Sequence, residues 1–214
     1  MQKVYDYIDA HQKEFLEDLF RLVRIPSVSP LPGHQADIQS CAACVKEIME
    51  ECGLKAAIYP TAHNPVVYGE GPQKPGRPTI LIFGHYDVQP EGEHAEWDSD
   101  PYEPEIRDGR IYARGVGDNK GQIYAHIKAY QAYCAVKGEP GVNLKYIVEG
   151  EEEIGSVDLA DFVASHLDLL RADITVWSDS NIHASGKPII ILGLKGISSM
   201  KVTVQGPSSD VHSQ

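Results

Sequence analysis

The sequence predicts an α/β fold, built on a mixed and mostly parallel sheet flanked by helices. Segments with apolar residues at helical spacing alternate with short apolar runs over the 214 residues. The helical segments are long enough to cross over between parallel strands. With 42% hydrophobic and 8% aromatic residues, the chain has the composition of a globular protein.

The first predicted elements are two helices. Residues 3–24 repeat apolar side chains at helical period. Pro26 ends this helix, because proline lacks the N–H that a helix interior needs. A second helix is expected over residues 36–52, with Gly53 just beyond its end.

Most of the other predicted elements are strands. They are expected at residues 54–59, 65–69, 79–83, 109–115, 142–148, 173–179, 188–193 and 196–206. The run TILIF at 79–83 is apolar throughout, which is typical of a strand buried on both faces. Two more helices are predicted at 120–137 and 156–170, the latter with Ser156 as its N-cap. Residues 88–109, rich in Asp, Glu and Pro, are expected to form a long loop.

The charge balance bears on the class of partner. The formal net charge is −12, from 31 acidic and 19 basic residues. Nucleic acids and anionic membranes favour clustered Lys and Arg, so neither is an expected partner. The N-terminal segment is too charged for a secretory signal, and no long apolar run predicts a membrane span, so a cytoplasmic protein is expected.

Three of the four cysteines lie on one predicted helix. Cys41 and Cys44 have the C-x-x-C spacing of some zinc and redox sites, but no second pair follows them. Together with Cys52 they share a helical stripe with Val45 and Met49. We therefore interpret them as buried, reduced thiols.

Acidic and histidine residues follow several of the predicted strands. His85 and Asp87 come after 79–83, the cluster 149–153 after 142–148, and Asp179 at the end of 173–179. Asp118 lies in a glycine-rich loop before a predicted helix. In α/β sheets, chemistry gathers beyond the carboxyl ends of the strands, so we expect these side chains at one sheet edge.

Each motif taken alone also has an ordinary structural interpretation. His85-x-Asp87 could be core or surface residues, although in extended backbone Asp87 can accept the second ring N–H of His85. Asp118 could cap a helix, and its loop matches neither the phosphate-loop nor the dinucleotide fingerprint. The glutamates could favour a helix N-terminus, and Asp179 could be a turn residue.

The combination is more specific than its parts. One histidine backed by a carboxylate, followed by an aspartate, paired glutamates and another aspartate, is the ligand set of a dinuclear hydrolase. Mixed imidazole and carboxylate ligands suit zinc, manganese or cobalt.

Four motifs, in order, carry a family resemblance. GHYDVQP (84–90), WDSDPYEPEIRDGRIYARGVGDNKG (97–121), EGEEEIGS (149–156) and SDS (178–180) resemble carnosinase-type dipeptidases. These belong to the metallopeptidase family of acetylornithine deacetylase, succinyl-diaminopimelate desuccinylase, aminoacylase-1 and glutamate carboxypeptidase. The resemblance runs from the first helix to the last residue, and implies the zinc-peptidase catalytic fold.

The resemblance implies a role for each matched residue. His85 would bind the first metal with Asp87 orienting it, Asp179 would complete that site, and Asp118 would bridge both metals, with a cis peptide bond after it. In the family's E-E-x-G-S pattern, Glu153 would bind the second metal and Glu152 would be the general base. Glu149 and Glu151 lie outside the pattern and are interpreted as electrostatic background.

The implied activity is hydrolysis of an amide bond by a water activated between two divalent metal ions, zinc first among them. Substrates would be dipeptides, or alternatively N-acyl amino acids, with a free carboxylate. The longer family members suggest a homodimer. In the segment DVHS, His212 resembles a family histidine that reaches the partner subunit's active site and stabilises the oxyanion.

The sequence also departs from the family pattern. Residues 1–195 correspond to the N-terminal part of the catalytic domain, and 196–214 to the start of an inserted α+β lid or dimerisation domain. No residue matches the second metal's histidine, so we expect a fragment of a longer enzyme. An inactive fragment or noncatalytic binding module remains the alternative of another class, and an aminopeptidase of related type a weaker one.

Overall fold

The structure is a computed structural model that describes residues 1–180, 182–187, 189–206 and 208. The chain divides into two compact units, residues 1–180 and 181–214. Within the described residues, every helix and strand lies in the first unit. None of these helices combines the length and the apolar character that crossing a bilayer requires.

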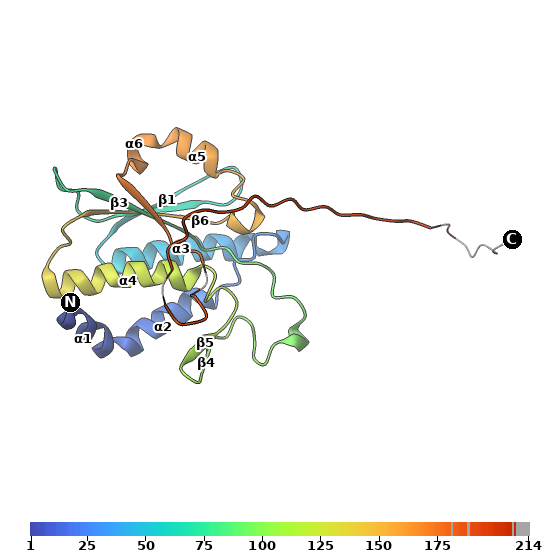
Figure 1. Cartoon of the computed structure of the whole chain (residues 1–214), viewed down its shortest axis with the longest axis horizontal. Coiled ribbons are helices and arrows are strands. Elements are labelled where there is room, and N and C mark those ends of the chain that lie inside the picture. Colours follow the sequence, from blue (N-terminus) through green and yellow to red (C-terminus); the bar gives the residue numbers. More distant parts are fainter. Residues whose placement is uncertain (181, 188, 207, 209–214) are drawn as a thin grey trace. The chain divides into compact units, whose positions relative to one another are not determined.

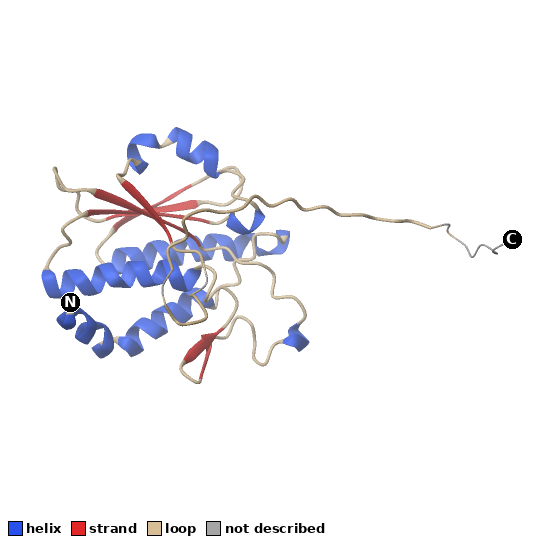
Figure 2. Ribbon diagram, in the orientation of Figure 1, coloured by secondary structure: helices blue, strands red, loops and turns tan. Residues whose placement is uncertain are grey.

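A five-stranded sheet organises the first unit (Figures 1 and 2). In spatial order its strands are β1 (Lys55–Tyr59), β2 (Val66–Glu70), β6 (Asn143–Glu149), β3 (Thr79–His85) and β7 (Ile174–Trp177). β3 runs parallel to β6 and β7, whereas β2 is antiparallel to both of its neighbours. The predicted mixed sheet flanked by helices is confirmed.

Helices cover both faces of this sheet (Figure 2). On one face, α3 (Gln35–Glu51) and α4 (Lys120–Lys137) pack against the strands, and α1 (Gln2–Ala10) and α2 (Gln12–Val23) pack on these two helices. The other face carries α5 (Leu159–Ser165) and α6 (Leu167–Leu170). Because successive strand residues point to opposite faces, Ile82 packs into the larger core with α3 and α4. Its neighbour Leu81 packs into the smaller core with Phe162 and Leu170.

Two predicted helices are each interrupted at a histidine. The helix expected at 3–24 divides at His11, and the one expected at 156–170 divides at His166. Each ring Nδ1 bonds a carbonyl four residues back, that of Tyr7 at 2.8 Å and that of Phe162 at 2.9 Å. A polar side chain that competes in this way for a backbone carbonyl weakens helix continuity.

The predicted N-cap at Ser156 is wrong. Ser156 has φ of +51°, and Asp158 precedes the first residue of α5. An N-cap residue has extended backbone, so a left-handed Ser156 belongs to the turn that leaves the glutamate cluster.

The long loop contains a small hairpin, of which only the second strand was predicted. β4 (Glu105–Arg107) pairs with β5 (Arg110–Tyr112). Asp108 and Gly109 between them have φ of +50° and +74°. This is the Asp-Gly pattern of a two-residue hairpin turn, and it was the available signal for β4. The strand predicted at 109–115 is thus the shorter β5.

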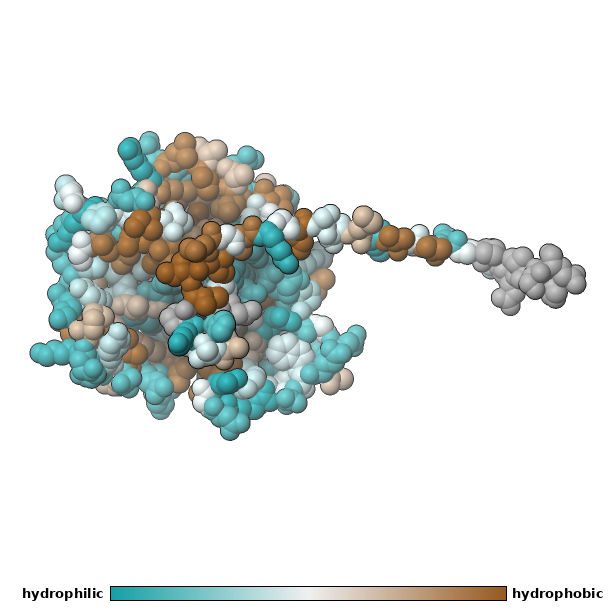
Figure 3. Space-filling view, viewed as in Figure 1, coloured by the Kyte–Doolittle hydropathy of each residue, from teal (hydrophilic) through white to brown (hydrophobic). Residues whose placement is uncertain are grey.

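The second unit differs from the prediction. Strands were expected at 188–193 and 196–206, and Pro188 lies outside the described residues. Residues 189–206 form no strand in the structure, so a first strand of a lid domain is not observed. A strand requires backbone partners, and these residues have no ladder. Their apolar side chains are exposed, to 96% at Leu192 and Ile197, as Figure 3 shows along the segment.

The four cysteines are all free thiols. Cys41, Cys44 and Cys52 are buried and Cys134 is half-buried, which confirms the interpretation of the stripe on α3 as core. Burial raises the pKa of the Cys44 thiol to about 12, so this thiol is protonated at neutral pH.

Candidate metal centre

The candidate site lies where three parallel strands end. His85 is the last residue of β3, and Asp179 follows β7 by two residues. The short helix η3 (Glu152–Ile154) follows β6, and Asp118 lies just before α4. This edge is the expected place for a site in an α/β sheet, because the carboxyl ends of parallel strands present their loops together.

The imidazole of His85 is at the centre of the site and fully buried. Its Nε2 lies 3.1 Å from Asp118 Oδ1, 3.4 Å from Asp179 Oδ2 and 4.0 Å from Glu152 Oε2. Its Nδ1 lies 3.0 Å from the main-chain oxygen of Asp87 and 3.3 Å from Oδ1 of the same residue. Since a carbonyl oxygen only accepts hydrogen bonds, the Nδ1 proton is held there and Nε2 faces the three carboxylates.

The carboxylates form two overlapping groups that could hold metal ions. One group is His85, Asp118 and Asp179; the other is His85, Glu152 and Glu153. In each group the possible ligand atoms lie within 4.8 Å of one another. Asp118 is on the open side of the site, with 64% of its side chain exposed. The peptide bond after Asp118 is cis.

The electrostatics of the site favour a cation. Burial opposes a charged imidazole, but hydrogen bonds to Asp179 and Asp87 prevail and raise the pKa of His85 to about 11. The same contact with His85 lowers the pKa of Asp179. Burial raises the pKa of Glu152, which the neighbouring His85 partly offsets. One nitrogen and several oxygens that together attract positive charge are a suitable donor set for zinc, manganese or cobalt.

Asp87 supports both groups. Its carboxylate accepts the hydroxyl of Ser29 at 2.5 Å and the backbone N–H groups of Glu152 and Glu153 at 3.2 and 3.1 Å. Gln89 donates to the carboxylate of Glu153 at 2.9 Å, and burial raises the pKa of Glu153. From the sequence, Asp87 is predicted to act on His85 alone, and Gln89 has no predicted role.

Glu149 and Glu151, interpreted from the sequence as electrostatic background, are both buried. They are 1% and 2% exposed. Burial raises the pKa of Glu149 to about 7, and Ser156 donates a hydrogen bond to it. Glu151 accepts the backbone N–H groups of Asn64 and Asp158, both at 2.8 Å. Glu149 ends β6 and Glu151 lies two residues later in the turn, and both carboxylates are buried. The spacing in the sequence alone does not distinguish this placement from a run of solvated charges.

A third group of acidic residues and histidine is accounted for by its own hydrogen bonds. His63, Glu151 and Asp158 offer possible ligand atoms that lie within 4.8 Å of one another. The His63 backbone N–H donates to Asp158 at 2.8 Å, and its ring lies 3.1 Å from the same carboxylate. With both Glu151 oxygens also engaged, this group joins the 61–65 loop to the start of α5.

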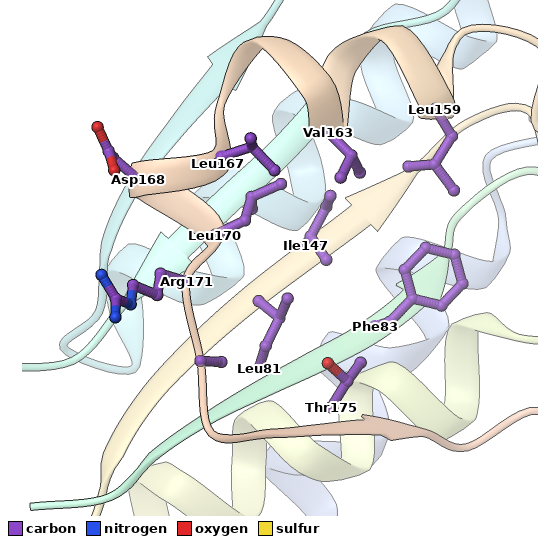
Figure 4. A pocket seen from close by; sticks show the side chains of 11 residues that line it. Leu81, Phe83, Ile147, Leu159, Val163, Leu167, Asp168, Leu170, Arg171 and Thr175 are labelled. Atoms are coloured by element: carbon purple, nitrogen blue, oxygen red, sulfur yellow. The ribbon is translucent and has the colours of Figure 1, made fainter.

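A separate cavity of about 580 Å³ lies between α5, α6 and the sheet (Figure 4). It is lined mainly by apolar side chains, among them Leu81, Phe83, Ile147 and Leu170, and includes none of the candidate metal ligands. This hollow and the candidate metal ligands are therefore in different places. His212, the remaining predicted site residue, lies outside the described residues.

Known proteins share these features. The family model described as "Peptidase family M20/M25/M40" matches residues 81–198, more than half of the chain. The Beta-Ala-His dipeptidase of Homo sapiens is 34% identical over the whole chain, which covers 45% of that relative. The Cys-Gly metallodipeptidase dug1 of Schizosaccharomyces pombe is 31% identical over the whole chain, which covers 48% of it. The chain thus spans about half the length of these relatives.

Solved structures agree with the sequence matches. Human carnosine dipeptidase 1 superposes with a TM-score of 0.77 at 34% identity, over 84% of this chain and 41% of that one. The M20 family metallo-carboxypeptidase Sso-CP2 from Sulfolobus solfataricus gives 0.75 at 37% identity, over 82% of this chain and 39% of that one. The fold, the order of the motifs and the matched family model together place the chain: it belongs to peptidase family M20/M25/M40.

Proposed function

We propose that this chain carries the metal centre of a dipeptidase, which hydrolyses an amide bond with the aid of two divalent ions. His85, Asp118 and Asp179 would hold the first ion, and Asp118 and Glu153 would contribute to the second. Zinc is the first choice, with manganese or cobalt as alternatives. The observation that carries the proposal is the buried His85 ring, whose Nε2 lies within 3.1 to 4.0 Å of three carboxylates.

The residues of the chain would divide the chemistry among them. Bound divalent ions would polarise the scissile carbonyl and lower the pKa of a water molecule. Glu152 would accept a proton from the attacking water on its carboxylate and deliver it to the leaving amine. Burial raises the pKa of Glu152 and so brings the pKa of this base closer to neutral pH. Asp87 would hold the Nδ1 proton of His85 and keep Nε2 directed at the site.

Small peptides with a free carboxylate are the proposed substrates. Relatives matched over the whole chain include a Beta-Ala-His dipeptidase and a Cys-Gly metallodipeptidase, which favours dipeptides over N-acyl amino acids. Because the chain spans about half of these relatives, activity, a homodimeric state, and a role for His212 are proposals for the assembled enzyme. The same holds for the division into a catalytic part, 1–195, and the start of a lid domain, 196–214.

Metal stoichiometry tests the proposal directly. The chain would be stripped with a chelator, reloaded with zinc, freed of excess metal and assayed by elemental analysis. We expect specific binding in the parent and a loss of at least one equivalent in Asp118→Ala. Asp98→Ala is the matched control, because Asp98 is 89% exposed and lies outside both ligand groups. Equal metal content in parent and Asp118→Ala, or none in the parent, would refute the proposed centre.

A further inference from the structure

Asn119 lies at the junction of the segments that carry the first ligand group. It follows Asp118 in sequence, precedes α4, and is 1% exposed. Its Oδ1 accepts the backbone N–H of His85 at 3.2 Å. Its Nδ2 donates to the backbone carbonyl of Ser178 at 2.7 Å and to Oε1 of Gln122 at 2.7 Å. One amide group therefore connects the end of β3 with the segment that follows β7.

Two of these hydrogen bonds, from the His85 N–H and to the Ser178 carbonyl, fix backbone. The Asn119 side chain also hydrogen-bonds to the Asp179 carboxylate. His85 is held at its own N–H, Asp179 through the carbonyl of its neighbour Ser178, and Asp118 through the peptide it shares with Asn119. A small rotation of any one backbone segment would move a ligand atom by a large fraction of a metal–ligand bond length. A single rigid amide that spans all three segments limits such rotations.

Helix capping does not explain this asparagine. Asn119 occupies the N-cap position of α4, yet its side chain makes no capping hydrogen bond to the helix. An Asn at this position usually accepts an N–H from the first helical turn. Here Oδ1 is directed at β3 instead. A Cβ added at Gly84 would lie 2.6 Å from this oxygen, so the glycine before His85 leaves the space that Asn119 fills.

The same face of α4 continues the contact with the segment after β7. Gln122 donates to the carbonyl of Ser180 at 3.3 Å, and Nε2 of His126 lies 2.8 Å from the hydroxyl of Ser178. Among the described residues, the side chains of Gln122 and His126 form hydrogen bonds with this segment, and Gln122 also accepts one from Asn119. Of these three side chains, that of Asn119 is the one that also hydrogen-bonds to β3. Buried polar groups that lose a partner are costly, so removal of the amide leaves an unpaired N–H at His85 and an unpaired carbonyl at Ser178.

We propose that Asn119 is the positioning residue of the metal centre, which holds His85, Asp118 and Asp179 in one arrangement before any ion binds. This inference rests on the proposed function, because it assumes that these three residues bind the first ion. Outer-sphere residues that orient ligands typically change metal affinity by about 10- to 100-fold. We expect a weakening of this size on removal of the Asn119 side chain.

Cobalt binding, followed by optical titration of the chelator-treated chain, tests the inference. Asn119→Ala is compared with Asn143→Ala, a matched control in which another buried asparagine is truncated. Asn143 is 6% exposed, accepts the N–H of Lys74 at 2.7 Å and donates to the carbonyl of Lys74 at 3.1 Å. Asn143 is the first residue of β6, and His85 pairs with Glu149 at the other end of this strand. Asn143 therefore lies about 20 Å from the site.

Asn119→Ala should bind cobalt about 10- to 100-fold more weakly and with an altered ligand-field spectrum. Asn143→Ala should stay within about twofold of the parent, since it removes no contact to the ligand segments. Hydrogen exchange of the metal-free proteins adds a second readout. The His85 amide and the segment 178–179 should lose protection in Asn119→Ala but not in Asn143→Ala.

Asn119→Asp decides the question if the alanine variant does not fold. It keeps the acceptor for His85, replaces the donor to Ser178 by an oxygen, and adds a negative charge that by itself favours cation binding. Weaker cobalt binding despite that charge supports the inference, and equal or tighter binding overturns it. A parent that binds no cobalt refutes the proposed centre and this inference together. A parent that binds, with Asn119→Ala indistinguishable from Asn143→Ala in affinity and exchange, refutes the inference alone.

Discussion

Asp87 contacts both halves of the candidate site. On one side it faces Nδ1 of His85, and on the other it receives the N–H groups of Glu152 and Glu153. The position of the proposed base is therefore coupled to that of the proposed first ligand through one buried residue. A change at Asp87 is expected to disturb both functions at once, whereas a change at Glu152 should affect only one.

Glutamine at position 152 separates the roles of the two adjacent glutamates. For the dipeptide hydrolysis proposed above, assayed in the assembled enzyme with equal metal loading, Glu152→Gln should lower kcat by about 10²- to 10⁴-fold, because it removes a general base. Its metal content, measured by elemental analysis, should equal that of the parent. Glu153→Gln is the contrasting variant and should lose metal. If Glu152→Gln loses metal as well, Glu152 is a ligand and the assignment of the base is wrong.

At the level of single residues, the sequence predicts where charge gathers better than what each charge does. The motif around Glu152 and Glu153 placed the cluster at the end of a strand, and the structure has it there. It did not indicate that Glu151 is held by two backbone N–H groups from segments at positions 64 and 158. Such contacts depend on chain segments that meet only after folding, so no local pattern contains them.

Among the elements, helix α4 begins directly after Asp118 and Asn119. Its first residue, Lys120, is fully buried and donates to the carbonyls of Leu22 at 3.3 Å and Ile25 at 2.6 Å, at the end of α2. Burial lowers the pKa of this lysine, so the two carbonyl contacts offset part of the cost of placing it in the core. α4 thereby connects the N-terminal helices to the metal centre.

His126 on α4 should make stability depend on pH. Burial lowers its pKa below 6.5 in the folded state, so the unfolded chain binds the proton more strongly. Stabilisation is complete above pH 6.5 and is lost as the pH falls toward the folded-state pKa, by up to about 1.4 kcal/mol per pH unit. Denaturant unfolding of the metal-free chain between pH 5 and 7.5 should therefore show that the free energy of unfolding changes less steeply with pH in His126→Gln than in the parent. His94→Gln, at a position 63% exposed, should keep the parent slope. Identical slopes for all three proteins would contradict the expectation.

The limits of prediction at the element level are also physical. Strands β2, β3 and β6 were predicted from apolar runs because burial selects such residues directly. The helix interruptions at His11 and His166 were not predicted, because a histidine that hydrogen-bonds to a carbonyl one turn back leaves the apolar periodicity of the helix intact. The hairpin strand β4 was missed because its three residues, Glu105 to Arg107, include one apolar side chain and so form no apolar run.

For the whole molecule, the division after Ser180 predicts that the first unit folds by itself. It contains both hydrophobic cores and all helices and strands of the described residues. A chain ending at residue 180 should unfold cooperatively, with a Tm within about 2 °C of the parent, as expected when exposed residues are removed. The measurement is calorimetry on both proteins. A chain ending at Leu170 lacks β7, which pairs with β3, and should be markedly less stable. A large drop in Tm already at residue 180 would show that residues 181–214 contribute to the folded core.

Sheet order was the global feature that the sequence could not supply. Apolar runs identify strands but not their neighbours, and nothing local indicates that β6 pairs with both β2 and β3. The candidate site was nevertheless predictable in outline, since parallel strands deliver their exits to the same edge in any order. The strands predicted at 188–193 and 196–206 are not observed in the described residues, because an apolar run becomes a strand only beside a partner.

The place of β6 between β2 and β3 has a consequence for synthesis of the chain. β2 ends at residue 70 and β3 at residue 85, while β6 ends only at residue 149. During translation, two apolar strands therefore emerge long before the strand that separates them, and they remain without their native neighbour for more than fifty residues of elongation. At about 5–20 residues per second this interval lasts several seconds, in which exposed strand edges are open to incorrect pairing. The nascent chain is thus expected to need protection by a chaperone until residue 149 has left the ribosome.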